Sequence, residues 1–183
     1  MFGTKNVAPM GKSAYIRPGV NEVEFVKVSG EENYLEFSMK LVGEENENST
    51  NFRLYMGSKS QQGFQESRIR TMGEAATKDD SITNIEASSI EDYGSKLNKF
   101  FAGKKVRMLF TGKEYLRQDG NIGTRCDIGV GLFVEPIDAS PSSLKYDESR
   151  HMTKLEIEED TTSGESTLPG FIDNVSDDDD LPV

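Results

Sequence analysis

Apolar and polar residues alternate along three stretches near the start of the chain, at positions 20–28, 34–42 and 50–57. A period of two residues is typical of β-strands that bury one face. In the first stretch, Val26 and Val28 fall out of phase with the inward pair Val23 and Phe25, which predicts a β-bulge. The residues expected to face inward in the other two stretches are Leu35, Phe37, Met39, Leu41, Phe52, Leu54 and Met56. Short polar connections predict an antiparallel meander.

The pattern changes after position 57. Residues 58–83 are polar, with weak helical character at best. A helix is predicted over Ser89–Ala102, because apolar residues recur there at helical spacing and Ser88 and Glu91 have the spacing of a capping box. Gly103 stands where a helix-terminating glycine is expected.

Strand-like alternation returns in Lys105–Thr111 and again in Asp127–Val134. Between them, Asp119-Gly120 is the signal of a hairpin turn. In the closing strand, the residues predicted to share one face are Ile128, Val130, Leu132 and Val134. After Pro136 the periodicity stops.

This order of elements predicts a mainly β protein, an OB-fold-like five-stranded antiparallel barrel with one helix inserted between strands 3 and 4. An α+β sandwich or another small barrel would give the same pattern. We expect an N-terminal arm at 1–13, an OB-like nucleic-acid-binding domain at 14–137, and a flexible acidic linker and tail at 138–183.

Charge is distributed unevenly along the 183 residues, whose net charge is −11. Residues 1–134 hold 18 Lys and Arg and 18 Asp and Glu, whereas 135–183 hold 3 and 14. The acidity therefore belongs to the tail, which composition predicts to be disordered. The neutral body is compatible with a positive groove that the tail can occupy.

Several classes of function find no support in the sequence. No apolar run is long enough for a membrane span, and the first residues lack the apolar core of a signal peptide, so a cytoplasmic location is expected. With a single cysteine, Cys126, and a single histidine, His151, neither a disulfide nor a Cys/His zinc site is expected. The chain has no phosphate-loop motif and no Ser-His-Asp set, so we expect neither an enzyme nor a cofactor.

Basic and aromatic residues recur on the outward phase of the predicted strands. Cations follow phosphates and flat rings stack on bases, so this combination suits single-stranded nucleic acid. The alternative is that each is an ordinary surface strand residue. The candidate nucleic-acid-binding residues are Tyr34, Lys40, Arg53, Tyr55, Lys105, Arg107, Lys113, Tyr115 and Arg117, with Arg125 on the return strand.

The chain ends in four aspartates and a short apolar plug. An acidic terminus can serve solubility alone, or bind divalent cations weakly, but apolar residues suit docking into a partner's pocket. The candidate partner-binding residues are Asp177, Asp178, Asp179, Asp180, Leu181, Pro182 and Val183.

An OB-like body followed by a linker and Asp-Asp-Asp-Asp-Leu-Pro-Val resembles the single-stranded-DNA-binding (SSB) proteins of bacteria and, more closely, of phages. The phrases Ile16–Val20 and Phe101–Val106 are similar to small phage replication proteins. Val183 stands where that family commonly has phenylalanine, which favours a partner encoded alongside this protein. The resemblance implies coating of single strands in the host cytoplasm during replication, recombination and repair. It also implies recruitment of replication proteins such as a polymerase, helicase or primase through the tail.

The expected function is therefore sequence-nonspecific binding of single-stranded DNA, with the tail competing for the groove. A phage structural or adaptor protein, whose acidic tail binds a basic protein, is the alternative. RNA as the ligand and homo-oligomerisation both stay open.

Overall fold

Three antiparallel strands open the sheet in the computed structural model, which describes residues 15–43, 48–131 and 133–156. They are β1 (Gly19–Glu31), β2 (Tyr34–Leu41) and β3 (Thr50–Tyr55), and β2 lies between the other two. The predicted inward residues of β2 and β3 are buried, except for the half-buried Leu41. The meander and its inward face are confirmed.

The predicted bulge lies in β1, where the register against β2 shifts between Phe25 and Lys27. It turns the Val26 side chain outward, 44% exposed, and returns Val28 to the core, 2% exposed. The backbone N–H of Val28 donates to Oδ1 of Asn98 at 2.8 Å, so a helix side chain satisfies this bulge donor.

Two α-helices, not one, lie between β3 and β4. The 19-residue α1 (Lys59–Thr77) occupies the stretch that we expected to be weakly helical at best, and a short 3-10 helix, η1 (Ser81–Asn84), follows it. Ser58 begins α1 with a capping box: its Oγ accepts from the Gln61 N–H, and the Gln61 side chain accepts from the Ser58 N–H.

The one predicted helix, Ser89–Ala102, is confirmed as α2 (Ile90–Phe101), with Gly103 in the left-handed region after it. Its N-cap is Ser89, whose side chain accepts from the Asp92 N–H, so the predicted capping residue Ser88 was one position early.

A close approach of backbones seats α2 on β1. A Cβ atom on Gly94 of α2 would lie 2.1 Å from the Gly30 nitrogen, and one on Gly30 would lie 1.9 Å from the Ile90 carbonyl oxygen. Only glycine fits at either position, so α2 packs directly against the end of β1.

The second half of the sheet is a long hairpin. Strand β4 (Lys105–Leu116) turns at Gly120, with φ +79°, into β5 (Ile122–Ile128). The predicted closing strand Asp127–Val134 is wrong, because the chain leaves β5 at Ile128 and resumes pairing with β4 only in β6 (Val134–Pro136). Val130 is 71% exposed in the connection, where the N–H of Gly129 donates to the Leu109 carbonyl.

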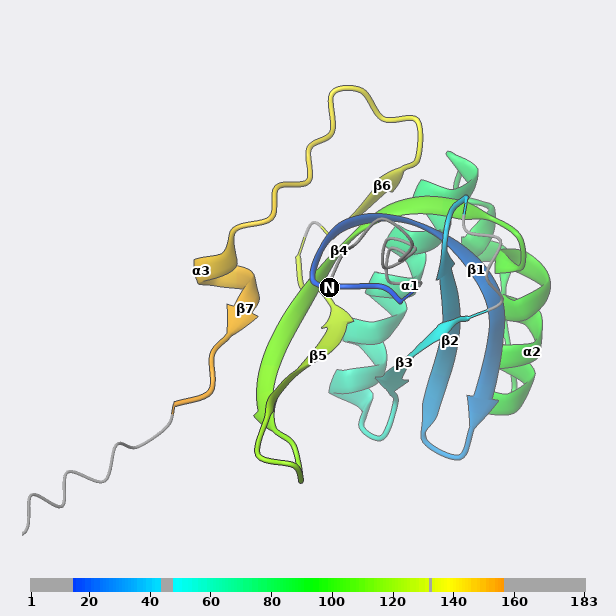
Figure 1. The fold of residues 1–183 in the computed structure, drawn as a ribbon. Helices are drawn as coiled ribbons and strands as arrows, with labels where there is room; N and C mark the ends of the chain where they lie inside the picture. Colours follow the sequence, from blue (N-terminus) through cyan, green and yellow to red (C-terminus); the bar gives the residue numbers. More distant parts are fainter. Residues whose placement is uncertain (1–14, 44–47, 132, 157–183) are drawn as a thin grey trace, which may run out of the picture.

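The fold is mainly β, with a largely antiparallel sheet of seven strands and three α-helices in the described part of the chain (Figure 1). The order is β3-β2-β1-β4-β5, while β6 and β7 (Met152–Thr153) both pair with β4, β7 in parallel. No ladder joins β3 to β5 within the described ranges. Arg68 of α1 donates to the Ile128 and Gly129 carbonyls at 3.0 and 2.8 Å, so α1 is anchored at the end of β5.

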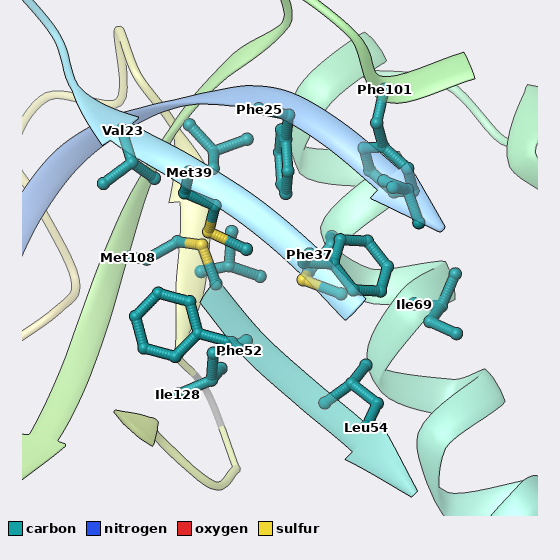
Figure 2. Close-up of a cluster of buried hydrophobic side chains, with 14 of the residues drawn as sticks. Val23, Phe25, Phe37, Met39, Phe52, Leu54, Ile69, Phe101, Met108 and Ile128 are labelled. Carbon is teal, nitrogen blue, oxygen red and sulfur yellow. The ribbon is translucent and has the colours of Figure 1, made fainter. Parts of the chain in front are cut away.

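Aromatic and sulfur-containing side chains fill the space between the sheet and the helices (Figure 2). Phe25 of β1 lies 4.6 Å from Phe101 of α2 and 6.2 Å from Phe37 of β2, measured between ring centroids. Phe52 of β3 lies 5.2 Å from Phe110 of β4. These contacts tie the two halves of the sheet together from inside.

Ordered structure continues past position 137, where we expected the flexible linker to begin. Residues 137–156, here called the strap, include the buried Leu144, the short helix α3 (Glu148–His151) and β7. Figure 1 shows α3 and β7 beside β4, on the side away from α2. The predicted tail residues Asp177–Val183 lie outside the described residues.

Candidate nucleic-acid interface

Two tyrosines and an arginine form a cluster on the outward face of β2 and β3, here called the aromatic patch. Tyr34 and Tyr55 are direct partners in the β2–β3 register, and their ring centroids are 5.7 Å apart with a tilt of 56°. The guanidinium carbon of Arg53 lies 4.6 Å from the centroid of the Tyr34 ring, within cation–π range. Tyr55 is 48% exposed, so one flat ring is open to a ligand.

Glu36 holds the arginine of the aromatic patch in place. Its Oε2 accepts from Arg53 Nε at 2.8 Å across the β2–β3 register, and this hydrogen bond raises the pKa of Arg53. The pairing orients the guanidinium over Tyr34 but also offsets its charge.

Lys40 and Lys105 are brought together by β1, which lies between their strands. Both face Glu24, at 3.6 and 3.7 Å from its carboxylate oxygens. Lys40 and Lys105, both predicted to contact phosphates, therefore share the carboxylate of Glu24, and a phosphate would have to compete with that carboxylate. Exposed pairs of this kind are worth only about 0–1 kcal/mol, so the competition is feasible.

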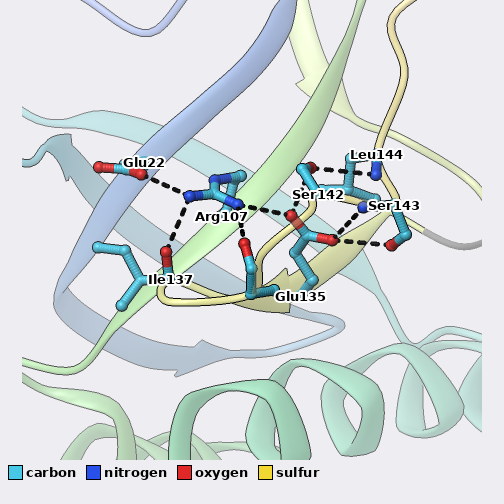
Figure 3. Close-up of polar contacts among 8 residues, drawn as sticks. Glu22, Arg107, Glu135, Ile137, Ser142, Ser143 and Leu144 are labelled. Carbon is cyan, nitrogen blue, oxygen red and sulfur yellow. Dashed lines mark hydrogen bonds and ion pairs between the residues drawn. The ribbon is translucent and has the colours of Figure 1, made fainter.

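Arg107 is placed differently from the other candidate residues (Figure 3). Its guanidinium pairs with Glu22 and Glu135, each at 2.9 Å, and also donates to the carbonyls of Ile137 and Ala139. Only 19% of its side chain is exposed. These contacts fasten the start of the strap to β4, and we therefore assign Arg107 a structural role.

Arg107, Glu135, Ser142 and Ser143 form a polar cluster, here called the clamp, in which Glu135 is the buried member. Burial by itself would raise the pKa of its carboxyl, but hydrogen bonds from Ser142 and Ser143 and the contact with Arg107 outweigh burial and lower the pKa to about 2. The alternation of apolar and polar residues could not predict the clamp, because Ser142 and Ser143 lie in a segment without a repeating pattern.

The outward face of the β4–β5 hairpin carries the remaining candidates. Lys113, Tyr115 and Arg117 follow one another at alternate positions of β4 and beyond its end, and all three are exposed. Arg125 lies directly opposite Lys113 on β5. A Cβ on Gly123 would lie 2.6 Å from Arg117 Nε and 2.7 Å from Tyr115 Cζ, so both side chains lie over this glycine.

The aromatic patch on β2 and β3 is separated in the sheet from the β4–β5 hairpin by β1. Figure 1 shows the turn between β1 and β2 and the β4–β5 hairpin at the same end of the molecule. In the described residues, no carboxylate is ion-paired with Lys113, Arg117 or Arg125. The hairpin thus supplies free positive charge, whereas the aromatic patch supplies rings.

Comparison with protein-family models finds no match, and a search of curated proteins finds no similar sequence. Within the described ranges, no helix has the length and apolar character needed to cross a bilayer. The same residues contain no cluster of three or more His, Cys, Asp or Glu placed to hold a metal ion.

Proposed function

We propose that this protein binds single-stranded DNA without sequence preference, using an OB-type barrel. The strand path β3-β2-β1-β4-β5 supports this proposal, since a partly open five-stranded barrel has such neighbours. In OB-folds, oligonucleotides bind on the face of strands 2 and 3, between the first and last hairpin loops. In such a barrel, the aromatic patch on β2 and β3 would lie on this face.

One observation carries the proposal: Tyr34, Arg53 and the half-exposed Tyr55 are gathered on the outward face of adjacent strands. Bases would stack on Tyr55 and Tyr34, each stacked base contributing about 1–3 kcal/mol by alanine substitution. Stacking does not depend on base identity, so this surface suits binding without sequence preference.

The backbone contacts would fall mainly on the β4–β5 hairpin. Within the described residues, Lys113 and Arg117 have no ion-paired carboxylate to displace. The exposed Tyr115 beside them offers a further stacking ring. Lys40 and Lys105 would contribute by exchanging Glu24 for a phosphate. Arg107 is no longer part of the proposed interface.

The acidic tail would compete for the same surface. Residues 157–183 contain nine Asp and Glu and no Lys or Arg. Because an incoming strand is also a polyanion, it would displace the tail and leave Leu181–Val183 available to replication proteins.

Titration of labelled oligonucleotides tests the proposal. We expect binding that strengthens with oligonucleotide length, weakens as salt rises and favours single strands over duplex. Absence of binding to single strands at low salt would overturn it and leave the adaptor function. An equal affinity for RNA of the same sequence would extend the ligand class to RNA.

A further inference from the structure

The strap adds a third strand, β7, beside β4 of the β4–β5 hairpin. Thr153 of β7 pairs with Lys113 of β4, and Lys113 pairs with Arg125 of β5. These three residues therefore form one row across β7, β4 and β5. The neighbouring row is formed by Thr111 and Asp127.

A pocket of about 350 Å³ lies over this row. Its charged and polar lining comes from two separate parts of the chain: the hairpin contributes Lys113 and Arg125, and the strap contributes Arg150, His151 and Thr153. Asp127 is the one carboxylate that lines it among the residues that the structure describes. Its Oδ1 accepts from the Ile128 N–H at 2.8 Å.

The charges in this pocket are arranged unlike those elsewhere on the sheet. Two cations directly opposite one another on neighbouring strands repel, yet neither Lys113 nor Arg125 has an ion pair within the described residues. In the described part of the chain, the one ion pair of Arg150 is a long contact of 3.8 Å with Asp147, and 81% of the Arg150 side chain is exposed. An anion between these cations would relieve the repulsion.

The strap is held firmly enough to position its share of the pocket. Gly112 leaves room for it: a Cβ there would lie 2.6 Å from the sulfur of Met152. On the far side of β7, the Leu155 N–H donates to Glu114 at 3.0 Å. These contacts hold the backbone of β7 beside Lys113, and α3, which carries Arg150, directly precedes β7.

We propose that this pocket is a phosphate subsite, in which Lys113, Arg125 and Arg150 bind one backbone phosphate of a single-stranded nucleic acid. The inference rests on the proposed function and deepens it, since it makes the strap part of the binding surface. A strand would run from the aromatic patch to the hairpin and be held there by a charge cluster that the strap completes.

Two measurements on the full-length chain test the subsite. The first follows the backbone amides of Gly112 and Thr153 by NMR while inorganic pyrophosphate is added to wild type, Arg125→Gln and Arg150→Gln. The second measures affinity for an oligothymidylate over a range of salt concentrations. Lys145→Gln is the matched control, because Lys145 is an exposed strap cation that does not line the pocket.

We expect pyrophosphate to shift both amides in wild type and less in the two arginine variants. Each arginine variant should flatten the slope of log K against log salt by about 0.7, the value for one lost single-strand phosphate contact, while Lys145→Gln keeps the wild-type slope.

Two other results would overturn the subsite. If wild type binds oligothymidylate and all three variants keep its slope, the subsite is wrong and the proposed function stands. If pyrophosphate shifts the amides but no single strand binds, the assignment to nucleic acid fails together with the proposed function.

Discussion

Individual cations on the outward face of the sheet differ in whether a carboxylate faces them. Lys40 and Lys105 share Glu24, whereas Lys113 faces another cation. Exposed ion pairs are worth about 0–1 kcal/mol, so the first two can exchange partners at small cost. Arg107 also donates to two backbone carbonyls, and it would leave these acceptors unpaired if it moved.

Replacement of Tyr55 by alanine should weaken binding of single-stranded DNA by about 1–3 kcal/mol, or roughly 5- to 150-fold, because a stacking ring is lost. Tyr55→Phe keeps the ring and should retain most of the affinity. Fluorescence anisotropy of a labelled oligonucleotide measures both. An affinity for Tyr55→Ala equal to that of wild type would remove the aromatic patch from the interface.

Glu135 gives the clamp a pH dependence whose sign follows from its pKa. The folded-state pKa of about 2 lies below the ordinary value of 4.5, so the ionised carboxylate stabilises the fold. This contribution is complete above pH 4.5 and is lost as the pH falls toward 2.

We therefore expect Glu135→Gln to lower the Tm near neutral pH and the gap from wild type to narrow in acid. Thermal denaturation at a series of pH values measures the gap. The exposed Glu31→Gln serves as the control. A gap that stays constant down to pH 2 would contradict the role of the ionised clamp.

At the scale of elements, sequence reasoning succeeded where one face of an element is apolar throughout. Strand β2 alternates without interruption, and α2 has apolar residues at regular helical spacing. Helix α1 was missed because its buried residues are confined to its second half, from Ile69 to Ala75, although Ser58-x-x-Gln61 carried a capping signal. The prediction of one continuous strand over Asp127–Val134 was wrong, because Ile128 ends β5 and Val134 begins β6, and Val130 lies exposed in the connection between them. The predicted Leu132 lies outside the described residues.

The candidate site was less predictable than the strands. Strand phase correctly put Tyr34 and Tyr55 on one face, because phase is a local property. Cation pairing depends on register between distant strands, so the position of Glu24 between Lys40 and Lys105 could not be deduced from spacing.

Alanine should have opposite effects at two helical glycines, because Gly94 of α2 lies against β1 and Gly63 of α1 has open space around it. Gly94→Ala should destabilise the protein by at least about 1–3 kcal/mol, because the new methyl meets backbone atoms of β1. Gly63→Ala in α1 meets nothing within 4 Å and should stabilise by about 0.5–1 kcal/mol through helix propensity. Urea denaturation measures both. A stable Gly94→Ala variant would contradict the close approach of the two backbones.

At the scale of the whole molecule, charge is separated along the chain, because the net charge of −11 lies entirely in residues 135–183. Residues 1–134 are neutral in total, yet the hairpin and the strap concentrate Lys113, Arg125 and Arg150 around one pocket. The described chain ends at Glu156, one residue after the Leu155 N–H bonds to Glu114 of β4. Because Thr153 of β7 lines this pocket and Glu156 follows it closely in the chain, the acidic residues 157–183 begin near these cations, which favours competition within one molecule over competition between molecules.

Deletion of Ser176–Val183 should consequently tighten binding of single-stranded DNA at low salt. The gain should shrink as salt rises, because salt screens the attraction between the tail and the hairpin. Replacement of Asp177–Asp180 by asparagine keeps the length and removes the charge, so it should reproduce the gain if competition is electrostatic. Salt-dependent titration of all three proteins tests this prediction. Equal affinities at low salt would show that the tail does not compete with DNA. If deletion tightens binding and the asparagine variant does not, the effect comes from Leu181–Val183 and not from the charge.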